Sequence, residues 1–133
     1  MANIQFWKDR ENRTVQANLF SEQAEQLAKE LAEDAKRGKD VNKRTQLRKF
    51  YDEVLRLNTE SKRPESQWKD ILPLVNMVVA KAAYAKGRSK VSENFLSFMR
   101  DSIKQIQDPD DLNLFANFFE AFMGFYRLYG PSN

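Results

Sequence analysis

The residues of this sequence with the clearest capacity for binding chemistry are lysines and arginines, which gather in two stretches of the chain. Residues 36–49 hold seven cations and one acid, and residues 81–90 hold four cations and no acid. The two stretches carry a net charge of +10, although the whole chain of 133 residues carries only +3. Such clusters suit phosphate, because Arg and Lys contacts to phosphate are charge-assisted and release condensed counterions.

The sequence lacks the residues that most catalytic sites and metal sites use. The sequence contains no cysteine and no histidine, which excludes thiolate sites and removes the commonest general base and metal ligand. Carboxylate or lysine catalysis stays possible in principle. The acids of residues 108–111 could suggest magnesium, but capping and the helix dipole explain acids at a helix start better. We therefore predict no catalytic residue, no metal, no cofactor and no enzymatic activity.

The apolar pattern predicts an all-α protein, a compact bundle of about five helices without strands of useful length. A first helix is expected from a Ser21 cap, with Phe20 as a hydrophobic staple, to Gly38. A second helix should run from about residue 42 to 58. Its core-facing stripe recurs at helical spacing and consists of Leu47, Phe50, Tyr51, Val54 and Leu57.

Helix punctuation also marks the next two elements. Pro73 is expected at or near the first turn of a third helix, which runs through Lys86 and has Gly87 as its C′ residue. Ser92 should cap a fourth helix. The buried seam of that helix is predicted to consist of Phe95, Met99, Ile103 and Ile106.

A fifth helix should run from Pro109 or Asp110 to Tyr129, where Gly130 and Pro131 end it. Its polar residues form one narrow stripe, so we predict a central, apolar C-terminal helix. A chain of this size is expected to leave some of the aromatic side chains of this helix for a partner. The aromatic residues concerned are Phe115, Phe118, Phe119, Phe122, Phe125, Tyr126 and Tyr129.

The length predicts one domain, and we expect a single helical domain, residues 21–133, after a partly irregular N-terminal segment, residues 1–20. The N-terminal residues are too charged for a secretory signal. The longest apolar-rich run, residues 71–85, is interrupted by polar residues and too short to span a bilayer. We therefore expect a cytoplasmic protein that does not contact membranes.

Ordinary structural roles explain part of the positive charge. Arg48 and Lys49 could pair with Asp52 and Glu53, four residues further on, and cations suit the end of the third helix. Neither role explains Lys81, since its amine must leave an apolar sector to reach water or phosphate. On a helical wheel, that sector consists of Leu74, Met77 and Ala85.

Backbone phosphate is the ligand that these cations suit best. Arg88, just past Gly87, has a forked guanidinium suited to bidentate phosphate contact. The sequence has no zinc finger, RNP motif or GXXG loop that would read bases, and Tyr84 is expected in the core. We therefore predict contacts to a nucleic-acid backbone with little sequence preference, made where both basic stretches share one outer surface.

Three segments resemble the small subunit of type III-A CRISPR effector complexes, also called Csm complexes. They are "TQLRKFYDEVLRL" (45–57), "LPLVNMVVAKAAYAKGR" (72–88) and "FANFFEAFMGFYRLYG" (115–130). The resemblance implies a non-catalytic, RNA-binding subunit of a ribonucleoprotein used in antiviral defense. Several copies of it would stack beside the backbone and large subunits and contact the guide RNA and target RNA.

The RNA-binding prediction comprises six residues. Positions that match the basic pattern of the family are Arg48, Lys49, Lys81 and Arg88. Arg44 and Lys86 join them on the charge distribution alone.

Two other functions are compatible with the sequence. The first is a helical adaptor that binds only protein, through the aromatic fifth helix, with its cations solvated. The second is a DNA-binding regulator that uses residues 42–58 as a recognition helix. We rank the regulator last, because Asp52 and Glu53 on the exposed face of that helix would repel DNA.

Overall fold

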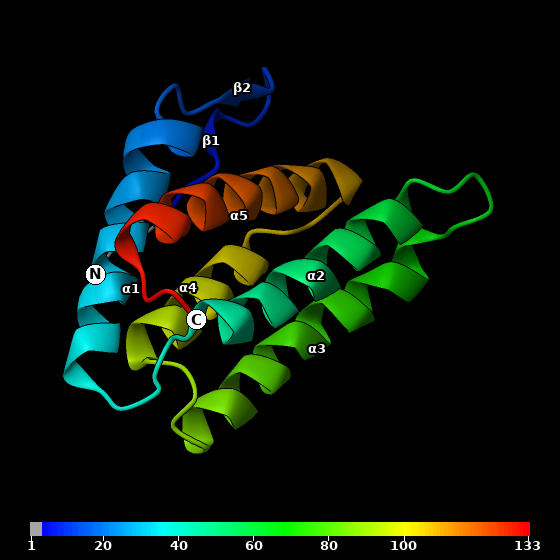
Figure 1. Ribbon diagram of the computed structural model, residues 1–133. Helices are drawn as coiled ribbons and strands as arrows, with labels where there is room; N and C mark the ends of the chain where they lie inside the picture. The colour runs from blue at the N-terminus through cyan, green and yellow to red at the C-terminus, as the bar shows by residue number, and fades with distance from the viewer. Residues whose placement is uncertain (1–3) are drawn as a thin grey trace.

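The computed structural model describes residues 4–133 and consists mainly of five α-helices (Figure 1). Helices make up 69% of the structure, so the all-α prediction is confirmed. The elements in chain order are β1 (Trp7–Asp9), β2 (Thr14–Val15), the π-helical turn η1 (Leu19–Gln23), α1 (Ala24–Arg37), α2 (Arg44–Ser61), α3 (Trp68–Gly87), α4 (Glu93–Lys104) and α5 (Pro109–Tyr129). The antiparallel pair β1–β2 is a small hairpin that the sequence pattern did not predict.

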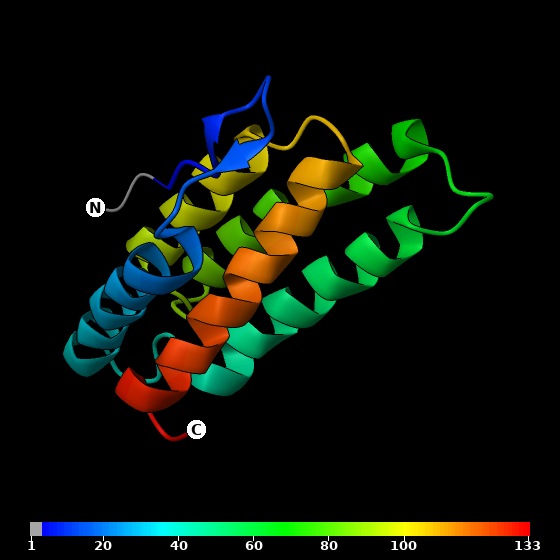
Figure 2. The same cartoon turned by 90° about the horizontal axis from the view of Figure 1, so that it is seen from above.

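The C-terminal helix α5 is the central element, as predicted. It lies between α1 and α2, and α4 packs against it from below in the view of Figure 1. The antiparallel helices α2 and α3 lie side by side and extend beyond the other helices, so their connecting loop projects from the bundle (Figure 2). Their opposite ends, where the basic stretches lie, meet the rest of the bundle.

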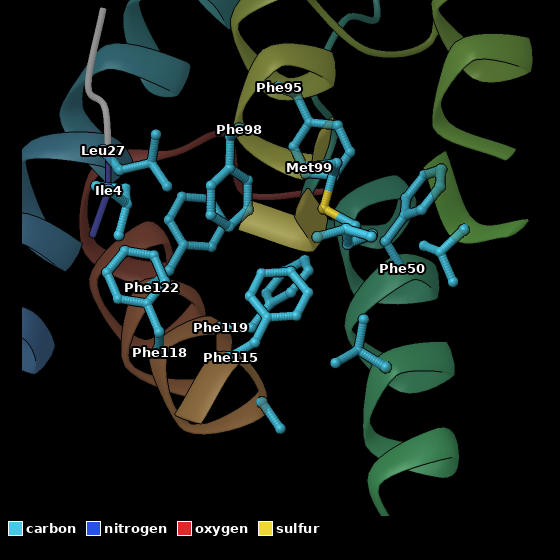
Figure 3. Close-up of a cluster of buried hydrophobic side chains, with 14 of the residues drawn as sticks. Ile4, Leu27, Phe50, Phe95, Phe98, Met99, Phe115, Phe118, Phe119 and Phe122 are labelled. Carbon is cyan, nitrogen blue, oxygen red and sulfur yellow. The ribbon is translucent and has the colours of Figure 1, made fainter. Parts of the chain in front are cut away.

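Aromatic side chains of α4 and α5 lie at the centre of the core, to which the other helices also contribute (Figure 3). Phe98 of α4 lies with its ring centroid 5.7–6.0 Å from four phenylalanine rings of α5. Those four residues and Tyr126 are fully buried, whereas Phe125 and Tyr129 are half-buried. The bundle therefore covers most of the aromatic surface that we expected it to leave for a partner.

Three helix boundaries match their sequence signals. The Ser92 hydroxyl accepts a hydrogen bond from the backbone N of Phe95 (3.3 Å), so Ser92 caps α4 as predicted. Asp108 caps α5 in the same way, through the backbone N of Asp111 (3.0 Å). Helix α5 ends at Tyr129, before Gly130.

The predictions of two other helix boundaries were wrong. Ser21 does not cap the first helix, because the helical path already begins with the π-helical turn at Leu19. Helix α3 begins at Trp68, so Pro73 lies inside it rather than in its first turn. The indole of Trp68 donates a hydrogen bond to the carbonyl of Gln107 (2.9 Å) and thereby anchors the start of α3 to the loop between α4 and α5. This contact spans 39 residues and leaves no local sequence signal.

Within residues 4–133, no helix combines the length and the apolar character that crossing a membrane would require.

Candidate nucleic-acid interface

Asn42 joins the two basic stretches of the chain. Its backbone N donates to the carbonyl of Lys90 (3.0 Å), and its side-chain Oδ1 accepts from the backbone N of Ser92 (2.9 Å). Its Nδ2 donates to the carbonyl of Leu31 (3.2 Å), and its own carbonyl accepts from the Tyr126 hydroxyl (2.6 Å). Asn42 is fully buried, so the loop before α2 is held against the loop after α3.

The end of α3 has a Schellman geometry, in which the residue after the cap adopts a left-handed conformation. The backbone N of Ser89 donates to the carbonyl of Lys86 (2.9 Å), and that of Lys90 donates to the carbonyl of Ala85 (2.9 Å). Ser89 has the positive φ of 59°, whereas Gly87 is still helical. The prediction that Gly87 is the C′ residue was therefore wrong by two positions.

A pocket of about 340 Å³ lies between α2 and α3, next to this turn. Lys49 of α2 lines one side of it, and Lys81, Arg88 and the following Lys90 line the other. Three of the six predicted residues therefore share one site, and each basic stretch contributes to it. Two uncharged side chains that can also contact a ligand line the pocket, Gln46 and Tyr84.

The charges of the pocket are only partly neutralised. The amine of Lys81 lies 3.2 Å from Glu53, whose carboxylate also accepts two hydrogen bonds from Arg56. These contacts, chiefly that of Arg56, hold the pKa of Glu53 below its ordinary value. Within residues 4–133, Lys49 and Arg88 form no ion pair. The pocket therefore presents net positive charge.

The other three predicted residues lie outside this pocket. Arg48 is exposed, but it projects about 100° around α2 from Lys49, because adjacent helical residues are offset by that angle. The backbone N and guanidinium of Arg44 donate to the carbonyls of Asn133 (2.7 Å) and Ser132 (2.6 Å).

Lys86 lines a different pocket, of about 330 Å³, between α1, α3 and α4. Acidic residues also line that second pocket, including Asp34 and Glu93. Helical spacing could have separated Lys86 from Lys81 and Arg88, because residues five and two positions apart lie about 140° and 160° apart around a helix. Only the helix packing decides which side of α3 faces α2.

The exposure of Tyr84 is the main feature that we predicted wrongly. Tyr84 is 68% exposed rather than buried in the core. A helical signal could have revealed this, because the buried residues of α3 recur at helical spacing and Tyr84 falls on the opposite side. These buried residues are Ile71, Val75, Val78, Ala82 and Ala85.

Two residues of the apolar sector around Lys81 are likewise exposed to solvent, Leu74 and Met77.

A family model described as Csm2 Type III-A matches residues 14–132. Searches of curated proteins and of solved structures each found no match. The matched region contains all five helices and both basic stretches, whereas β1 and the turn that follows it precede the match.

Proposed function

Because the chain belongs to the Csm2 Type III-A family, the small subunits of the Csm complex, we propose that it contacts the RNA of that complex through the pocket between α2 and α3. The observation that carries this proposal is the meeting of four cations from two distant stretches of the chain in one pocket. Lys49, Arg88 and Lys90 are available for phosphate because none of them pairs with an acid within residues 4–133.

The proposed contacts go to the RNA backbone and carry little sequence preference. Lysine and arginine bind phosphate by charge, and such contacts fix position without reading the bases. The guide RNA and target RNA of the complex are the proposed ligands. The proposed protein partners are other copies of this chain and the backbone and large subunits of the complex. In this proposal, catalysis belongs to the backbone and large subunits.

The predicted residues outside the pocket have secondary places in this proposal. Arg48 lies on the solvent side of α2, where it can contact the same RNA beyond the pocket. Lys86 faces acidic neighbours on the other side of α3, and Arg44 already donates to carbonyls of residues 132 and 133. We therefore expect Lys49 and Arg88 to contribute most to RNA affinity.

Replacing Lys49 and Arg88 with glutamate tests the proposal. The double variant should bind an oligoribonucleotide at least about tenfold more weakly at low salt. Its plot of log K against log salt should be flatter by about 1.4, since each lost phosphate contact on a single strand removes about 0.7. Fluorescence anisotropy over a salt series measures both effects, and circular dichroism checks the helical content.

Lys104→Glu is the matched control, because it makes the same kind of charge reversal on an exposed residue at the far end of α4. It should leave the affinity within about twofold of the parent. Unchanged RNA binding by the folded Lys49/Arg88 variant would contradict the proposed site.

A protein-binding adaptor remains the second candidate, but its surface differs from the one expected. Most of the aromatic side chains of α5 are buried, so that helix offers little to a partner. The exposed Leu74 and Met77 on α3 favour a protein contact instead. If this candidate is correct, the parent protein should not bind RNA, and replacing both residues with serine should abolish co-purification with a partner subunit.

A further inference from the structure

We infer that the pocket between α2 and α3 also binds an unpaired RNA base, which stacks on the ring of Tyr84. This inference rests on the proposed function and adds to it the class of RNA that the site prefers, a single strand. The starting observation is an exposed aromatic ring that lines a pocket together with four cations.

Tyr84 contributes little to the packing of this fold. It belongs neither to the buried core nor to the half-buried residues packed against that core. Within residues 4–133, its hydroxyl has no hydrogen-bond partner among the side chains or the backbone. A tyrosine contributes most to stability when its ring is buried. An exposed ring in a charged pocket therefore suits a ligand with a flat face.

Arg88 contacts the Tyr84 ring and can orient it for such a ligand. Its guanidinium carbon lies 5.7 Å from the centroid of the Tyr84 ring, a cation–π contact within one helical turn. Unpaired RNA bases commonly stack on aromatic rings and on arginine planes. Arg88 can therefore hold the ring in position and also contact the phosphate or base beside it.

The order of residues along α3 suits a strand that follows the helix. Lys81, Tyr84 and Arg88 are three and four residues apart, so they lie on the same face. The two cations are separated by about 10 Å along the axis, with the ring between them. A single strand along this face would place phosphates near the cations and a base over the ring. Lys49 faces this row from α2.

A duplex cannot use the ring in this way. Its bases are stacked on one another inside the helix, and sequence-independent contacts to it go to phosphates and 2′-hydroxyls. The pocket volume of about 340 Å³ falls within the range that holds small-molecule groups. It therefore suits one unpaired base, while a duplex could contact only the cations at its rim.

The test compares Tyr84→Ala with the parent on three RNAs of equal length: a single strand, a duplex, and a single strand with abasic sites. Stacking on an aromatic side chain is expected to contribute at least about fivefold per base. We expect Tyr84→Ala to weaken binding of the normal single strand by about that factor and to leave duplex binding within twofold. The parent should prefer the normal strand to the abasic strand, and the variant should bind both equally.

Three further variants separate stacking from other effects. Tyr84→Phe should retain affinity because it keeps the ring, and Tyr84→Leu should lose it although it stays apolar. Leu128→Ala is the matched control, since Leu128 is 72% exposed, lies on α5 and is outside the pocket. Equal losses for Leu128→Ala and Tyr84→Ala, or for single strand and duplex, would overturn the inference.

Failure of this inference is distinguishable from failure of the proposed function. If Tyr84→Ala changes nothing while the Lys49/Arg88 charge reversal still weakens binding of all three RNAs, base stacking is wrong and the phosphate site stands. If the charge reversal has no effect on any RNA, the proposed function itself is wrong.

Discussion

At the scale of single residues, Asn42 shows how one side chain can hold together the segments beside the proposed binding pocket. It combines a left-handed backbone, with φ of 57°, and hydrogen bonds to segments before and after it in the chain. Asparagine tolerates this conformation better than most residues, because its short polar side chain can bond locally. The arrangement of the pocket therefore depends on a buried residue that does not line it.

We predict that Asn42→Ala lowers the free energy of unfolding by about 3 kcal/mol, because it leaves the Ser92 N–H without its acceptor and removes the Nδ2 donor to the Leu31 carbonyl and the Ser92 hydroxyl. Asn42→Gly loses the same hydrogen bonds, but glycine adopts the positive φ without steric cost. Asn42→Gly should therefore be more stable than Asn42→Ala by about 1 kcal/mol. Urea unfolding measures both values. Equal stabilities for Asn42→Gly and Asn42→Ala would show that the backbone conformation is not strained.

At the scale of elements, the end of α3 decides where the cations of the second stretch project. Ser89 takes the left-handed position of the turn, and the two hydrogen bonds that close it hold Lys90 beside Arg88. Gly87, by contrast, is an ordinary helical residue, and a Cβ added there would meet nothing within 4 Å. Glycine is therefore not required at position 87.

We predict that Gly87→Ala raises the free energy of unfolding by about 0.5–1 kcal/mol, the usual gain from replacing a helical glycine. Ser89→Gly should also stabilise, by about 1 kcal/mol, because glycine adopts a positive φ without steric cost. Thermal unfolding of both variants measures the changes. A destabilised Gly87→Ala would instead support Gly87 as the C′ residue, which the sequence had suggested.

At the scale of the whole molecule, the N-terminal hairpin is part of the packed structure although the family match begins only at residue 14. The ring of Phe6 is fully buried and stacks on Phe115, 6.0 Å between centroids. The buried carboxylate of Asp111 accepts hydrogen bonds from Arg10 (2.6 and 2.7 Å) and from the indole of Trp7 (2.7 Å). Asp111 thus attaches the hairpin to the start of α5.

This attachment should depend on pH. Burial alone would raise the pKa of Asp111, but hydrogen bonds from Arg10, Trp7 and the backbone N of Gln107 outweigh it and lower the pKa below its ordinary value. A carboxyl group with a lowered pKa in the fold stabilises fully above its unfolded pKa of about 4, and this contribution disappears as pH falls through the folded pKa.

We therefore predict that Asp111→Asn lowers the free energy of unfolding by about 2 kcal/mol at pH 7. The loss is modest because the Arg10 side chain is 33% exposed and solvent screens the pair. The difference between variant and parent should shrink below pH 4. Denaturant unfolding across a pH series measures it, with the exposed Asp110→Asn as a control expected to change stability by less than about 0.5 kcal/mol. A difference that stays constant down to pH 2 would contradict the role of the carboxylate.

The sequence alone determined the helical class, the central position of α5 and several helix boundaries. The bounds of α5 and the cap of α4 follow from residues within a few positions of each other, such as Ser92 and Phe95. The same local patterns produced the resemblance to the Csm2 family, to which the chain belongs. Local hydrogen bonds and apolar periodicity can be read from a sequence because they involve neighbours along the chain.

Only the tertiary structure decided which cations meet. Lys49, Lys81 and Arg88 share a pocket, whereas Lys86 lies on another side of α3 and Arg44 contacts residues 132 and 133. The bonds that fix this arrangement join residues about 50 positions apart, as between Asn42 and Ser92. Such contacts depend on how helices pack, and that packing is decided by the whole core rather than by the residues near the site.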